Sequence, residues 1–132
     1  MMNKVNIEKK NLTGIVALLV HVANIDEIYT EKEKKIIKGF ISSFSYKETD
    51  TDEILKEAEK MESDSIQLLS FTSLIKKESL ELKTEVMEHL WKIVISDQSV
   101  DQYESSIMRR ICGLIYFPDK LSGEIKLKLL NN

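Results

Sequence analysis

A pair of carboxylates occurs twice in this chain, at matching positions of a segment that is itself repeated. The segment LLVHVANIDEIYTEKEKKIIKGFI returns in related form as HLWKIVISDQSVDQYESSIMRRIC. When the copies are aligned, Asp26 falls on Asp97 and Glu33 on Glu104, and Asp101 adds a fifth acid to the second copy. Oxygen ligands of this kind suit Ca²⁺ or Mg²⁺. Packing of the two copies about a pseudo-two-fold axis would gather all five carboxylates at one divalent-cation site.

The same acids also have a local interpretation. Thr30 followed by Glu33, and Asp101 followed by Glu104, each fit a capping box, in which two side chains satisfy N–H groups at a helix start. An Asp at a bend can also accept N–H groups from the turn that follows it. The chain has no alternating Asp loop with a central Gly, which excludes an EF-hand. We therefore interpret the acids mainly as local structure and keep weak cation binding as the alternative.

The elements that would position these acids are helices. An internal repeat of this size, spanning 18–41 and 89–112, predicts two similar helix-turn-helix units packed on each other. Apolar residues recur at helical spacing along the chain, and no period-two strand pattern is present. We expect an all-α compact bundle of about seven helices with two pseudo-symmetric helix-turn-helix halves. The first expected helix runs over about 7–25, and the second runs from Thr30 to 44–46. The third begins at Asp50 or Thr51, and the fourth runs over 64–77 with Ser63 as its cap. The last three run over about 80–96, 101–116 and 119–130.

Composition narrows the class of protein. Hydrophobic residues make up 42% of the 132 residues, and four Gly and one Pro are few, which favours long helices in a single domain spanning 1–132. A net charge of −3 gives no reason to expect a nucleic acid partner. The single Cys excludes an intramolecular disulfide. The longest apolar run is too short to be a transmembrane segment, and the N-terminus lacks a signal-peptide core. We expect a cytoplasmic protein.

The repeated segments resemble a known family. The phrases LLVHVANIDEIYTEKEKKII, SDSIQLLSFTSLIKKESL and HLWKIVISDQSVDQYESSIMRRICGLI are similar to segments of the TerB-like (tellurite-resistance protein B) family, over about residues 12–130. This resemblance implies a compact all-helical domain with pseudo-two-fold halves, and a link to tellurite resistance and stress responses through protein assemblies near the membrane. It also implies divalent-cation binding by the acidic turns. The residues carried over by the resemblance are Asp26, Glu33, Asp97, Asp101 and Glu104.

The chain departs from the family pattern within both turns. The Gly that follows each Asp in the family is Glu27 in the first copy and Gln98 in the second. Gly at that position would permit a left-handed backbone or the close approach of a ligand. The acidic position before Glu33 is Thr30, so the first copy offers one carboxylate fewer.

Other reactive residue types are interpreted as structural. His21 and His89 are not followed by a metal-binding residue three or four positions later. Trp91 and Cys112 fall on apolar helix faces, where a buried aromatic ring and a buried thiol are expected. No Ser-His-Asp arrangement is present. We therefore predict no catalytic residue.

The function that fits these observations is a non-enzymatic interaction module of the tellurite-resistance and stress-response type. It would dock a protein partner and would bind a divalent cation weakly at the acidic turns. A dedicated cation sensor is the alternative, and a metal-dependent phosphoester hydrolase is a more distant one, because it needs more ligands and a pocket. A row of lysines on the second predicted helix is compatible with peripheral membrane association.

Overall fold

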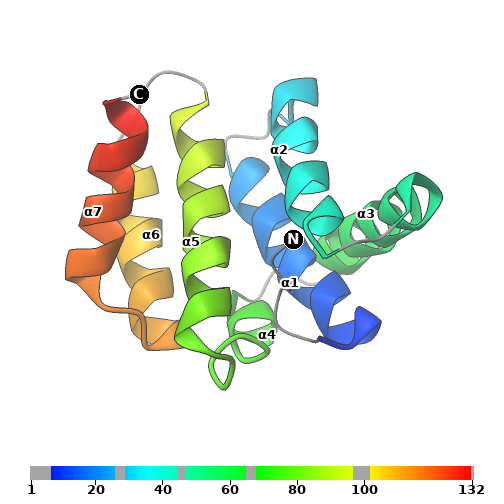
Figure 1. Cartoon of the computed structure of the whole chain (residues 1–132), viewed down its shortest axis with the longest axis horizontal. Coiled ribbons are helices and arrows are strands. Elements are labelled where there is room, and N and C mark those ends of the chain that lie inside the picture. Colours follow the sequence, from blue (N-terminus) through cyan, green and yellow to red (C-terminus); the bar gives the residue numbers. More distant parts are fainter. Residues whose placement is uncertain (1–6, 26–28, 45–46, 65–67, 97–101, 132) are drawn as a thin grey trace.

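The computed structural model describes residues 7–25, 29–44, 47–64, 68–96 and 102–131. Seven α-helices cover most of this part of the chain, and it contains no strand. Figure 1 shows most of them side by side as a bundle, with the helix over 48–64 crossing at one edge. The helices are α1 (Lys9–Ala23), α2 (Glu31–Ser42), α3 (Glu48–Asp64), α4 (Leu68–Thr72), α5 (Leu80–Ile95), α6 (Gln102–Ile115) and α7 (Asp119–Leu130).

The two central helices are the ones that the sequence predicts. In α1, every residue from Leu12 to Val20 is buried, so this helix is apolar on all sides. In α5, Val86, Met87 and Leu90 are fully buried. A helix without a polar face must be surrounded by other helices. Accordingly α1 packs against α2, α3, α4 and α5, and α5 packs against α1, α2, α6 and α7.

A third helix covers each half. In the first half α3 packs against α1 and α2, and in the second half α7 packs against α5 and α6. The halves meet where α1 and α2 both lie against α5. The short helix α4 packs against both α1 and α6. The connection between the halves therefore contributes to their joint core.

The boundaries of α3 and α4 differ from those expected. Helix α3 begins at Glu48, before the predicted Asp50 or Thr51, and it continues to Asp64. Ser63 is therefore part of α3, where its hydroxyl donates to Lys60 O at 2.9 Å, and it does not cap a fourth helix. Helix α4 is also shorter than the predicted 64–77.

The residues after α4 form turns with hydrogen bonds between residues three apart, which are tighter than the turns of an α-helix. The N–H groups of Leu74 and Ile75 donate to the carbonyls of Phe71 and Thr72, three residues back. Such i→i−3 bonds tighten the last turn of a helix and end it. This path buries Ile75 and places Leu74 against α1. Among the described helices, none is long and apolar enough to cross a bilayer.

Candidate functional site

The predicted acidic residues lie only partly within the described structure. Asp26, Asp97 and Asp101 are outside the described residues. Glu104 belongs to the first turn of α6, but its side chain is also outside the described part. Glu33 is the one member of the predicted set whose side chain is described. The predicted cation site therefore stays a prediction, and its geometry can be examined at Glu33.

Glu33 forms the capping box that the sequence predicts. Its carboxylate oxygen Oε1 accepts from Thr30 N–H at 2.8 Å, and Thr30 Oγ1 accepts from Glu33 N–H at 3.1 Å. The Glu33 side chain is only 4% exposed. A buried carboxylate is stabilised here by hydrogen bonds and by the partial positive charge of the α2 N-terminus. The cap role of Glu33 is confirmed.

Tyr29, which directly precedes the cap residue Thr30, joins the start of α2 to α3. Its hydroxyl donates to Glu59 Oε2 at 2.8 Å, and Lys34 Nζ lies 5.1 Å from the centre of its ring. Burial, followed by the hydrogen bond and charge of Glu59, raises the pKa of Tyr29 well above its usual value. Tyr29 is therefore a neutral hydrogen-bond donor that anchors the residues just before α2.

The start of α2 and the end of α5 lie at the same end of the bundle. Lys32, in the first turn of α2, donates from Nζ to the carbonyl of Ser96 at 3.2 Å. Ser96 is the C-terminal cap of α5 and directly precedes Asp97. Figure 1 shows the start of α2 and the end of α5 next to each other at the top. A lysine at a helix C-terminus also neutralises the partial negative charge of the last carbonyls.

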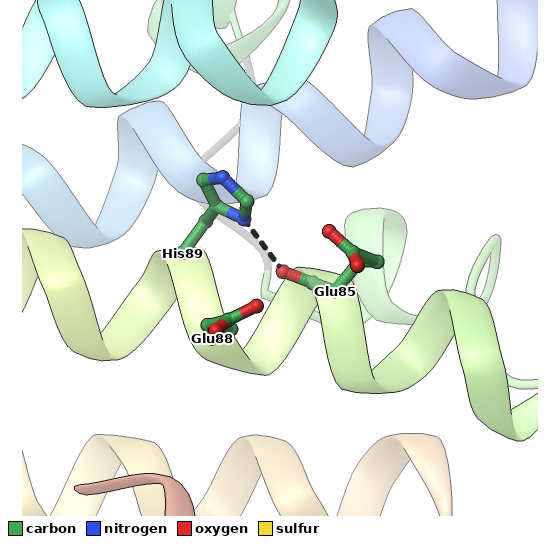
Figure 2. A group of neighbouring side chains, drawn as sticks. All are labelled: Glu85, Glu88 and His89. Atoms are coloured by element: carbon green, nitrogen blue, oxygen red, sulfur yellow. Dashed lines mark hydrogen bonds between the residues drawn. The ribbon is translucent and has the colours of Figure 1, made fainter. Parts of the chain in front are cut away.

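A second group of candidate ligands lies on α5 and was not predicted. Glu85, Glu88 and His89 each place one ligand atom within 4.8 Å of the other two (Figure 2). His89 is 9% exposed, and its Nδ1 donates to the backbone carbonyl of Glu85 at 2.8 Å. Its ring packs edge-on against Phe40 of α2, with centroids 5.1 Å apart. His89 thus faces the junction of α5 with α2.

The protonation state of His89 suits a metal ligand. Burial lowers the pKa of His89 below its usual value, so the ring is neutral at pH 7. A carbonyl can only accept, so Nδ1 carries the proton and Nε2 keeps its lone pair. A ring nitrogen hydrogen-bonded to a backbone carbonyl is a common arrangement behind metal-binding histidines. Neutral imidazole with two carboxylates suits Zn²⁺ or Mn²⁺ better than Ca²⁺. Figure 2 shows Nε2 directed away from Glu85 and Glu88, so the ring would have to turn before the three side chains could hold one ion.

The sequence contained a signal for this group. Glu85 and His89 are four residues apart, a spacing that places two side chains on one helix face. Both partners of His89 precede it in the chain, and no metal-binding residue follows it three or four positions later. His21, in contrast, is structural as expected, because its Nδ1 lies 3.3 Å from Glu62 Oε2 and so links α1 to α3.

Comparison with known proteins identifies the family. A family model described as "Tellurite resistance protein TerB" matches residues 12–127, which include both copies of the repeat and most of the chain. The chain belongs to the TerB family. Searches of curated proteins and of solved structures found no match. The TerB resemblance and the all-helical fold expected from the sequence are thereby confirmed.

The TerB match includes every residue discussed above as a candidate ligand. Glu33, at the start of α2, and the group on α5 both lie within the matched residues. The family assignment does not decide between them, because it names no ligand. The two candidate sites differ in their ligand atoms. The acidic turns offer oxygen alone, whereas the α5 group adds an imidazole nitrogen.

Proposed function

We propose that this TerB-family protein is a non-catalytic interaction module that binds a divalent cation at its acidic turns and docks a protein partner. The observation that carries the proposal is the hydrogen bond from Lys32 Nζ to Ser96 O at 3.2 Å. It ties the start of α2, which holds Glu33, to the end of α5, which directly precedes Asp97. This contact supports the proposal that acids from the two halves of the repeat act together.

A cation at this position has a physical role. The C-terminus of α5 carries partial negative charge, and acidic side chains beside it repel each other and that charge. Lys32 offsets part of this charge through its bond to Ser96. A bound Ca²⁺ or Mg²⁺ would offset the rest and join the two turns. Cation binding would therefore prepare one end of the bundle for a partner.

The observations also favour one second function, a dedicated cation sensor. The Glu85, Glu88 and His89 group supports it, because its mixed nitrogen and oxygen ligands suit Zn²⁺. The enzyme reading receives less support, since the TerB family is generally not enzymatic. A phosphatase assay with added Mg²⁺, Mn²⁺ or Zn²⁺ tests that third reading, and metal-dependent turnover would establish it.

Calorimetric titration separates the two cation sites. We expect Ca²⁺ or Mg²⁺ to bind the wild-type protein and to bind the Asp26→Asn, Asp97→Asn double variant at least tenfold more weakly. The matched control is Asp50→Asn with Asp64→Asn, which removes the same charge from α3. Zn²⁺ binding that is lost in Glu88→Gln but kept in the first double variant would support the sensor instead.

The interaction role needs its own measurement. The purified protein, immobilised with Ca²⁺ or with a chelator, is used to capture proteins from the source cell, and the captured proteins are identified by mass spectrometry. We expect a partner that is retained with Ca²⁺ and released by the chelator. No heat of Ca²⁺ or Mg²⁺ binding at millimolar concentration, together with no cation-dependent capture, would refute the proposal.

A further inference from the structure

A cleft of about 480 Å³ lies between α5, α6 and α7, in a part of the molecule that the proposed cation sites do not use. Its volume falls within the range of small-molecule sites, roughly 300–1,000 Å³. The side chains that give it chemical character come from all three helices. They are Trp91, Ser105, Arg109, Asp119, Ser122 and Lys126.

The floor of this cleft is rigid. Trp91 donates from Nε1 to Ser122 Oγ at 2.9 Å, which fastens α5 to α7. Both residues are only 5% exposed. Lys126 Nζ lies 5.3 Å from the centre of the Trp91 ring, a cation–π contact that holds the ammonium over the cleft. A polar ligand would therefore meet groups that are already in position, which lowers the entropy lost on binding.

Among the described residues, the cations of the cleft have no acidic partner. Arg109 and Lys126 make no ion pair with any described residue, whereas Lys38 pairs with Asp52 at 3.2 Å elsewhere on the surface. Asp119 is the one carboxylate in the lining, and it lies in the first turn of α7, where the helix N-terminus stabilises a negative charge. Two cations lining one cleft repel each other, and a bound anion would remove this repulsion.

We propose that this cleft binds a phosphate group between Arg109 and Lys126. A guanidinium offers two parallel N–H donors that match two phosphate oxygens, and an ammonium adds a compact positive charge. The hydroxyl of Ser105, one helical turn before Arg109, supplies a further donor. The cleft has room for a small organic group beside the phosphate, so both inorganic phosphate and a phosphomonoester fit this chemistry.

The chain carries its own reporter for this site. Trp91 is the only Trp, and it forms the floor of the cleft. Its fluorescence is followed while inorganic phosphate, glycerol 3-phosphate or glycerol is added, with chloride at the same ionic strength as the reference. We expect saturable changes with both phosphates and none with glycerol or chloride. The tighter of the two phosphate ligands then identifies whether the free ion or the ester is preferred.

Adjacent arginines provide a matched pair of variants. Arg109→Gln should weaken phosphate affinity about tenfold, because it removes a bidentate charge-assisted contact. Arg110→Gln removes the same charge from the same helix but does not line the cleft, so it should change affinity less than twofold. Far-UV circular dichroism checks that both variants are folded. Amide NMR shifts of Ser105 and Gly123 give a second readout that does not depend on the indole.

Two results would overturn the inference. One is the absence of a saturable response to either phosphate in the wild-type protein beyond the chloride reference. The other is an equal loss of affinity in Arg109→Gln and Arg110→Gln, which would show a general charge effect. If Arg109→Gln does not fold, Lys126→Gln followed by the NMR shifts takes its place, and it should also weaken binding about tenfold.

Discussion

Gly14 of α1 faces Leu74, which follows α4, so closely that a Cβ atom on Gly14 would overlap Leu74 Cδ1. The contact joins the first half of the repeat to the connection that leads into the second. Gly39 of α2 provides a contrast, since a Cβ there would meet no atom within 4 Å. The two glycines therefore have opposite consequences for stability.

We predict that Gly14→Ala lowers the free energy of unfolding by about 1 kcal/mol, because the end of the partly buried Leu74 side chain must shift away from α1. Gly39→Ala should raise it by about 0.5–1 kcal/mol, because alanine favours a helix interior. Chemical denaturation of the two variants measures both effects. A stabilising Gly14→Ala would show that Leu74 does not occupy this position.

Thr51 of α3 has a buried hydroxyl without a hydrogen-bond partner among the described residues. We predict that Thr51→Val raises the free energy of unfolding by about 1 kcal/mol, since it removes an unsatisfied buried polar atom while keeping the shape. Thr72→Val is the matched control. Thr72 is fully buried but donates to Leu68 O at 3.3 Å, so its replacement should destabilise the protein. Equal effects of the two changes in denaturant titrations would contradict this prediction.

Tyr116 ends α6 in a left-handed conformation, with φ of 61°, and the N–H of Phe117 closes the turn on Cys112 O at 2.9 Å. This position usually holds Gly, because a side chain is strained there. We predict that Tyr116→Gly is more stable than Tyr116→Ala by about 1 kcal/mol. Both variants lose the contact of the ring with Lys76, so their difference isolates the backbone. Thermal unfolding of the pair checks it, and a more stable Ala variant would be inconsistent with the left-handed turn.

His89 should make stability depend on pH. Its folded-state pKa is lowered from 6.5 by burial, so the unfolded chain binds a proton more readily. The stabilisation is complete above pH 6.5 and is lost as the pH falls from there through the folded-state pKa. His89→Gln does not titrate, and its amide can still donate to Glu85 O. We therefore expect the wild-type protein to lose more stability than His89→Gln between pH 7.5 and 5, as measured by urea unfolding. Parallel pH profiles would argue against a buried neutral ring.

The sequence predicted the all-helical architecture and several of its details. The apolar run in α1 marked a central helix, and the spacing of Thr30 and Glu33 marked the start of α2. It was less reliable between 47 and 80, where α3 begins earlier and α4 ends sooner than expected. In that region the path depends on the close packing of Leu74 on Gly14, a contact between residues 60 positions apart.

Sequence alone determined which segments form helices and which residues cap them, because those interactions join residues within about four positions of each other. Tertiary structure alone decided which helix ends meet. It placed Lys32 against Ser96 and packed Phe40 of α2 on the ring of His89. It also lined one cleft with Arg109 and Lys126, which come from different helices. Such groupings follow from how helix faces pack, and local spacing carries no information about distant faces.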